Sequence, residues 1–132
     1  MKRTKKATKK RSITRASAKD KGRRLQQMIC QKASELTGLP WGKDEPIESR
    51  PMGQSGVDVR LDTEARKLFP FSVEAKWQES WDVPGWIRQA QTNEMKDTDW
   101  LLVVKRSHSS PVCIMDMETF FELLSRSQEV KS

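Results

Sequence analysis

Two short segments decide the fold of this chain: SGVDVRL at residues 55–61 and, ten residues further on, FSVEAK at residues 71–76. In each segment apolar and polar side chains alternate, which is the period of a β-strand with two different faces. A polar turn at residues 62–67 separates the two segments. Two extended segments joined by a turn of this length predict an antiparallel hairpin.

Three polar side chains are expected on one face of this pair. Glu74 and Lys76 lie two residues apart and therefore point the same way, and the hairpin would bring Asp58 beside them. Mg²⁺ in proteins prefers carboxylate and carbonyl oxygens, so Asp58, Glu74 and the backbone carbonyl of Ala75 are candidate ligands. Lys76 can stabilise charge on a phosphate. The alternative is a solvated strand face that carries an ordinary ion pair.

The composition suits one small soluble domain. A chain of 132 residues has room for a single modest core. No apolar run approaches the roughly 20 residues that span a bilayer, and no apolar segment follows the basic N-terminus as in a secretory signal. We therefore expect no membrane contact. Cys30 and Cys113 lie far apart among apolar residues, which predicts buried free thiols in a reducing, cytoplasmic compartment.

Positive charge is concentrated at the N-terminus. Residues 1–24 contain twelve Lys or Arg and a single acid, Asp20, so the rest of the chain is mildly acidic although the formal net charge is +7. We expect a disordered basic arm over residues 1–18 and one domain over residues 19–132. Such an arm is typical of proteins that bind a polyanion, although a solubilising tail is the alternative. The basic residues expected to contact nucleic acid are Lys5, Lys6, Lys9, Lys10, Arg11, Arg15, Arg23, Arg24 and Arg50.

The first helix should begin near residues 17–20 and end at Gly38 and Pro40. Its apolar face has helical spacing and consists of Leu25, Met28, Ile29, Ala33 and Leu36. A long connection rich in Gly and Pro follows at residues 38–56, with one short strand near residues 47–50 and a segment at residues 52–56 that we expect to be mobile.

The second half of the chain predicts a helix, two strands and a final helix. Asp82 can cap a helix with Pro84 in its first turn, and the apolar runs at residues 101–104 and 112–115 are typical of strands. The apolar face of the last helix, capped by Asp116, consists of Met117, Phe120, Phe121 and Leu124. This order predicts an α/β sandwich with a central mixed sheet of about five strands flanked by helices.

Two motifs stand close together: GVDV at residues 56–59 and VEAK at residues 73–76, with Glu74 sixteen residues after Asp58. Together they resemble the PD-(D/E)XK nuclease superfamily. The single small domain, early helix and basic arm are most similar to archaeal-type and phage Holliday junction resolvases, over roughly residues 19–125. The resemblance implies a restriction-endonuclease-like fold and Mg²⁺-dependent hydrolysis of phosphodiester bonds in branched DNA, with Mn²⁺ as a substitute and no small-molecule cofactor. It also implies a homodimer acting on four-way junctions in a prokaryotic or phage-infected cell, during recombination, repair or phage DNA processing.

The resemblance also implies roles for individual residues. Asp58, Glu74 and the carbonyl of Ala75 would bind the metal, and Lys76 would be the catalytic lysine. Ser49 falls near a serine that junction resolvases place at the scissile region, and Gln89 resembles a glutamine close to the active site in many relatives. Trp77, directly after the motif, is a candidate for DNA contact through base stacking.

One departure from the family pattern concerns the first helix. Many members carry a Glu there a few residues after a Gly, whereas Gly22 is followed by Gln26 in this chain. Three explanations are open: Gln26 contributes a neutral oxygen, Glu35 or Glu48 substitutes, or the site holds fewer metals. Two alternatives to a junction resolvase follow: a nuclease of the same superfamily acting on nicks, flaps or duplex DNA, or a DNA-binding protein whose catalytic site has decayed.

Overall fold

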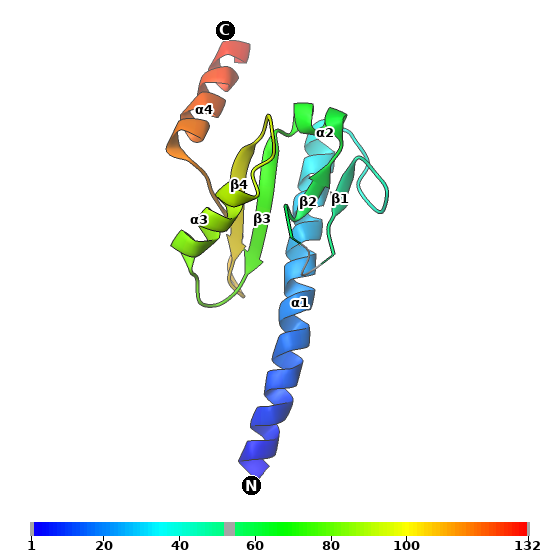
Figure 1. Cartoon of the computed structure of the whole chain (residues 1–132), viewed down its shortest axis with the longest axis vertical. Helices are drawn as coiled ribbons and strands as arrows, with labels where there is room; N and C mark the ends of the chain where they lie inside the picture. Colours follow the sequence, from blue (N-terminus) through cyan, green and yellow to red (C-terminus); the bar gives the residue numbers. More distant parts are fainter. Residues whose placement is uncertain (1, 52–54, 132) are drawn as a thin grey trace.

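The structure is a computed structural model of the chain, and it describes residues 2–51 and 55–131, with side chains over residues 17–51 and 55–129. Four helices and five strands occur in these residues (Figure 1). In chain order they are α1 (Lys2–Thr37), β1 (Ile47–Ser49), β2 (Val59–Leu61), α2 (Thr63–Leu68), β3 (Phe71–Trp77), α3 (Val83–Thr92), β4 (Asp99–Lys105), β5 (Val112–Ile114) and α4 (Met117–Lys131). The α/β class predicted from the sequence is confirmed.

The described strands form two small sheets instead of the single sheet of about five strands that the sequence predicted. β1 and β2 make an antiparallel pair, and β3, β4 and β5 make a mixed sheet in that order. β3 runs parallel to β4, with α3 as the crossover, and β5 returns antiparallel to β4. Helices cover both faces of the larger sheet, which keeps the layered arrangement of a sandwich.

The predicted hairpin between β2 and β3 is wrong. β2 pairs with β1 in the register Ser49 to Val59, and residues 62–67, expected to be a turn, contribute to helix α2. The Asp62 carboxylate caps α2 by accepting a hydrogen bond from the Ala65 amide at 2.8 Å. A helix in the connection turns the chain away, so β2 meets β3 at a single backbone bond, from the Asp58 amide to the Val73 carbonyl at 2.9 Å.

Two apolar cores lie on opposite faces of β3 and β4. One joins α1, β1, β2 and α2 to the sheet and includes Leu25, Ile47 and Val73, all buried. The other lies under α3 and includes Trp86, Trp100 and Leu102, all buried. Since both faces of β3 are covered, its polar positions Ser72 and Glu74 are also buried.

Helix α1 begins at Lys2, whereas the sequence predicted a flexible arm and a helix start near residues 17–20. The segment is made largely of Lys, Arg and Ala, which favour helix, and it holds no Gly or Pro before Gly22. The N-terminal half of α1 extends away from both sheets, and its C-terminal half lies beside β1 and β3 (Figure 1). None of the helices in the described residues is long and apolar enough to cross a membrane.

The prediction that both cysteines are buried is half right. Cys30 lies in the core, where burial raises the pKa of its thiol to about 12, but Cys113 is exposed on β5. Strand β5 is the edge of its sheet; its Ile114 packs against the core under α3, whereas Val112 and Cys113 are exposed. An edge strand with one neighbour leaves its side chains open to solvent. Both thiols are free.

Candidate active site

Asp58 sits where the chain passes from the β1–β2 pair to the edge of β3. Its side-chain Oδ2 accepts a hydrogen bond from the Ala75 amide at 2.7 Å. Because β3 is an edge strand, this amide faces away from β4 and needs an acceptor elsewhere. Asp58 supplies that acceptor, and the same bond fixes the carboxylate beside β3.

Glu74 projects from β3 toward the α3 side and is only 1% exposed. Its Oε1 accepts a hydrogen bond at 2.7 Å from the side-chain amide of Asn93, the residue that caps the C-terminus of α3. The same amide also donates to the Gly56 carbonyl at 3.3 Å. Asn93 therefore joins the end of α3, the loop before Asp58 and the Glu74 carboxylate.

The carboxyl groups of Asp58 and Glu74 interact directly. A side-chain hydrogen bond joins them, and it lowers the pKa of Asp58 while raising the pKa of Glu74. Burial and the negative charge of Asp58 together raise the pKa of Glu74 to about 7, against the opposing effects of the Asn93 hydrogen bond and the Lys76 charge. Burial also raises the pKa of Asp58, opposed by the Ala75 amide. Two acids sharing one proton at neutral pH form a site that gains from a nearby cation.

Lys76 follows on the same face of β3, half-buried at the end of the strand. Its positive charge lowers the pKa of both Asp58 and Glu74, so the ammonium lies within electrostatic reach of each carboxylate. Its Nζ lies 6.0 Å from the centre of the Trp86 ring, which guides the aliphatic stem along α3. The three residues predicted from the motif are thus brought together.

Ser49 and Gln26 form a second polar pair beside this trio. Gln26 lies on α1, is 2% exposed, and accepts a hydrogen bond on its Oε1 from the Ser49 hydroxyl at 2.8 Å. In the register of the smaller sheet Ser49 lies opposite Val59, the residue after Asp58. Ser49 is therefore near the carboxylates but bonds to Gln26.

The two acids considered as substitutes for a first-helix Glu are occupied elsewhere. Glu48 bonds to Arg60 at 2.8 Å and to the Asp44 amide, and Glu35 bonds to Gln31 on the exposed side of α1. Of the three residues considered, Gln26 lies beside the candidate site, where it bonds to Ser49. Its buried position was open to sequence reasoning, because it follows the core residue Leu25 on α1.

Gln89 and Asn93 occupy successive turns of α3. The Gln89 side chain is exposed, whereas Asn93 makes the contact with Glu74 described above. Sequence reasoning selected Gln89 from the resemblance and missed Asn93. The sequence feature that points to Asn93 is its position four residues after Gln89, on the same helical face. Arg50, predicted from the sequence as a nucleic-acid contact, lies beside Asp58: its charge lowers the pKa of Asp58, and its amide donates to the Asp58 carbonyl at 2.9 Å.

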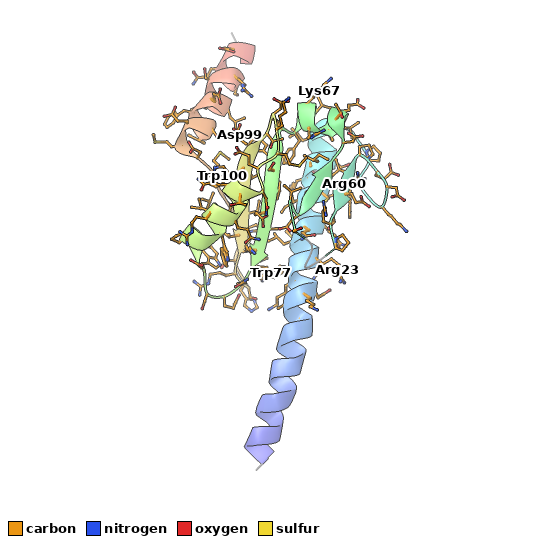
Figure 2. All side chains as sticks on the ribbon, in the orientation of Figure 1. Arg23, Arg60, Lys67, Trp77, Asp99 and Trp100 are labelled. Carbon is orange, nitrogen blue, oxygen red and sulfur yellow. The ribbon has the colours of Figure 1, made fainter. Side chains whose placement is uncertain are left out.

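The predicted nucleic-acid contacts fall into three groups. Lys5, Lys6, Lys9, Lys10, Arg11 and Arg15 lie on α1, with side chains outside the described part of the structure. Arg23 and Arg24 are exposed on the same helix, and the labelled Arg23 lies at the end of the body from which α1 extends (Figure 2). Arg50 lies at the carboxylate pair. Residues 52–54 of the segment expected to be mobile fall outside the described residues.

The donor set suits Mg²⁺ in chemistry and falls short of a full protein cage. The half-buried Asp58 and the buried Glu74 supply hard carboxylate oxygens, and Ala75, next to Glu74 in the chain, supplies a backbone carbonyl. Within residues 2–51 and 55–131 no cluster of three or more His, Cys, Asp or Glu side chains is found. Such a pair matches the usual Mg²⁺ arrangement of one or two carboxylates completed by water and phosphate.

Comparison with known proteins adds no identification. No family model matches the chain, and neither a curated protein nor a solved structure matches it. Function must therefore be argued from the site.

Proposed function

We propose that this protein is a metal-dependent, structure-selective DNA endonuclease, most similar in kind to a Holliday junction resolvase. The observation that carries the proposal is the contact between the half-buried carboxyl group of Asp58, just before β2, and the buried carboxyl group of Glu74 on β3, beside Lys76. An ordinary surface ion pair would be exposed and would not need a protonated acid. Strongly perturbed acids with a lysine beside them are typical of catalytic sites.

Phosphodiester hydrolysis needs an oriented water, stabilisation of charge on the phosphate, and help for the leaving oxygen. Asp58, Glu74 and the Ala75 carbonyl would hold Mg²⁺, with Mn²⁺ as a substitute; the ion supplies charge stabilisation and activation of water. The Lys76 ammonium lies on the same face and would stabilise the negative charge that grows on the phosphate oxygens. The Asn93 amide and the Ala75 amide hold one oxygen of each carboxylate, which leaves the other oxygens directed at the site.

The basic helix α1 would bind DNA without reading its sequence, because phosphate contacts provide affinity and no base information. Paired cuts across a four-way junction require two sites related by a two-fold axis, which is why we propose a homodimer. We place this activity in the cytoplasm of a prokaryotic or phage-infected cell, in recombination, repair or phage DNA processing.

Single-turnover cleavage of a synthetic four-way junction in Mg²⁺ tests the catalytic assignment. Asp58→Asn keeps the acceptor for the Ala75 amide, so the variant should fold, and Lys76→Ala removes a half-buried ammonium. We expect each to lower the rate about 10²–10³-fold. Matched controls are Glu64→Gln and Lys67→Ala on α2, which should cleave normally. Wild-type activity in either site variant would refute the assignment.

Side-by-side assays on junction, flap, nicked and linear duplex DNA separate a resolvase from another nuclease of the superfamily. Selective cleavage of the junction supports the resolvase, and equal cleavage of all four substrates contradicts it.

A second candidate is a DNA-binding protein without cleavage activity. Gln26 favours it, because a neutral amide occupies the buried position on α1 where a carboxylate would complete a larger metal site. Tight junction binding with no cleavage in Mg²⁺ or Mn²⁺ would establish this candidate in place of the nuclease.

A further inference from the structure

Three cationic side chains gather around one tryptophan at the end of β3. The Lys105 ammonium lies 4.5 Å from the centre of the Trp77 ring, the Arg24 guanidinium 5.4 Å and the Lys21 ammonium 6.0 Å. They come from α1 and from the end of β4, so the tertiary fold brings them together. Cation–π attraction to the indole ring offsets part of their mutual repulsion.

Hydrogen bonds hold the cluster in place. The Ser107 hydroxyl accepts from Lys21 Nζ at 3.2 Å and from the Trp77 indole N–H at 3.4 Å. Lys105 Nζ donates to the carbonyl of Arg106 at 3.2 Å and to that of Ser109. The cations are therefore oriented before any ligand arrives.

Positive charge is in excess around the ring. Arg24 bonds to Asp20 at 3.1 Å, but neither the Lys21 nor the Lys105 ammonium has a carboxylate within 4.0 Å in the described part of the chain. Glu79 is the other acid nearby, and it bonds to the Ser107 amide at 2.9 Å. Four cations face these two acids: Lys21, Arg24, Lys105 and Arg106. Unpaired ammonium groups held close together form a site for an anion.

We propose that Lys21, Arg24 and Lys105, arranged around Trp77, bind a phosphate of the nucleic-acid backbone. The sequence predicted that Trp77 stacks on bases, whereas in this arrangement its ring instead positions cations. Trp77 lies three residues beyond Glu74, about 10 Å along the strand at 3.3 Å per residue, and on the opposite face of β3, toward α1. Phosphates of one DNA strand rise 3.4 Å per nucleotide, so a strand that passes Glu74 and crosses the free edge of β3 reaches the cluster within a few nucleotides. In this way the cluster links the carboxylate pair to the basic helix.

The experiment measures binding of a fluorescent four-way junction over a range of KCl concentrations, in EDTA and in an Asp58→Asn background. Each lost phosphate contact lowers the slope of log affinity against log salt by about 0.9 on duplex DNA. Lys105→Gln and Lys21→Gln should each lower it by this amount, and Lys105→Arg should restore it. Lys67→Gln, at the opposite end of the body (Figure 2), removes the same charge and should not change the slope.

An unchanged slope in both Gln variants, with melting temperatures equal to the parent, would overturn the proposal. The proposal would also be overturned if inorganic phosphate at millimolar concentration competed with the junction as well as DNA does, because the site would then take free phosphate instead of a nucleic-acid backbone. The choice of DNA as ligand rests on the proposed function, yet the two fail separately. An altered salt slope in a protein that never cleaves DNA supports the phosphate site and refutes the nuclease.

Discussion

At the scale of single residues, the site depends on where one proton resides. Glu74 is almost fully buried beside Asp58, and its pKa of about 7 lies above the ordinary value of 4.5. The unfolded chain releases this proton near its ordinary pKa, whereas the folded protein keeps it until about pH 7. Between these values the folded state binds more protons, so the free energy of unfolding falls as pH rises.

This linkage predicts the behaviour of Glu74→Gln. The amide keeps an acceptor for Asn93 but cannot ionise, so we expect the variant to be more stable than the parent at pH 8 without metal, by about 1–3 kcal/mol. Urea unfolding at pH 5 and pH 8 measures the difference. At pH 5 the two proteins should differ much less. A Gln variant equally destabilised at both pH values would contradict the linkage.

Bound Mg²⁺ should lower the pKa of Glu74, which burial raises. A cation between the carboxylates stabilises their ionised forms, so Mg²⁺ should raise the melting temperature of the parent at pH 8 more than at pH 5. Glu74→Gln should lose most of this shift, and the distant Glu64→Gln should retain it. Equal shifts in all three proteins would place the ion elsewhere.

At the scale of elements, α1 combines two roles in one helix. Its C-terminal half supplies Leu25 and Ala33 to the core, and its N-terminal half extends away from the sheets and carries most of the basic residues. Deleting residues 2–16 should therefore leave the melting temperature nearly unchanged while weakening DNA binding steeply. Fluorescence anisotropy across KCl concentrations measures the binding, and circular dichroism measures the stability. A large loss of stability would show that the extension packs against the fold.

Helix α2 illustrates why connections are hard to predict. Residues 62–67 resemble a polar turn by composition, yet Asp62 caps a helix and Ala65 is fully buried beneath it. The burial of one small apolar residue against β2 decides between turn and helix. This contact with β2 cannot be predicted from residues 62–67 alone.

At the scale of the whole molecule, two apolar surfaces in the described part of the chain are exposed to solvent. The outer face of α4 exposes Met117, Phe120, Phe121 and Leu124, although Thr119 and Leu123 hold the other side of α4 against the body. A groove of about 420 Å³ lies between α1 and the edge of the larger sheet. Its lining includes Met28, Leu36 and Cys113, all exposed. We expect the α4 face of a second copy to cover this groove, since a two-fold axis buries both surfaces twice.

Light scattering and cross-linking test this dimer. The wild-type chain should have twice the monomer mass, and Phe121→Glu should be monomeric because it places a charge in the apolar contact. Under mild oxidation Leu124→Cys should form an intermolecular disulfide with the exposed Cys113, giving a covalent dimer that wild type does not form. The matched control is Glu122→Cys, on the opposite side of α4. A monomeric wild type that resolves junctions would refute the dimer.

The sequence by itself determined most elements and the three central residues of the candidate site. Helix α3 begins where Asp82 and Pro84 predict, and β4 and β5 lie where apolar runs predict them, because caps and periodicity act within a few residues. The spacing of Glu74 and Lys76 placed both on one face of a strand for the same reason.

Only the tertiary structure decided how these elements meet. The pairing of β2 with β1, the contact of Asp58 with the edge of β3, and the choice of Asn93 over Gln89 join residues that are distant in sequence. Each depends on which buried polar group needs a partner once the cores have formed. Local sequence records the side chains that can meet that need, and packing of the whole chain selects among them.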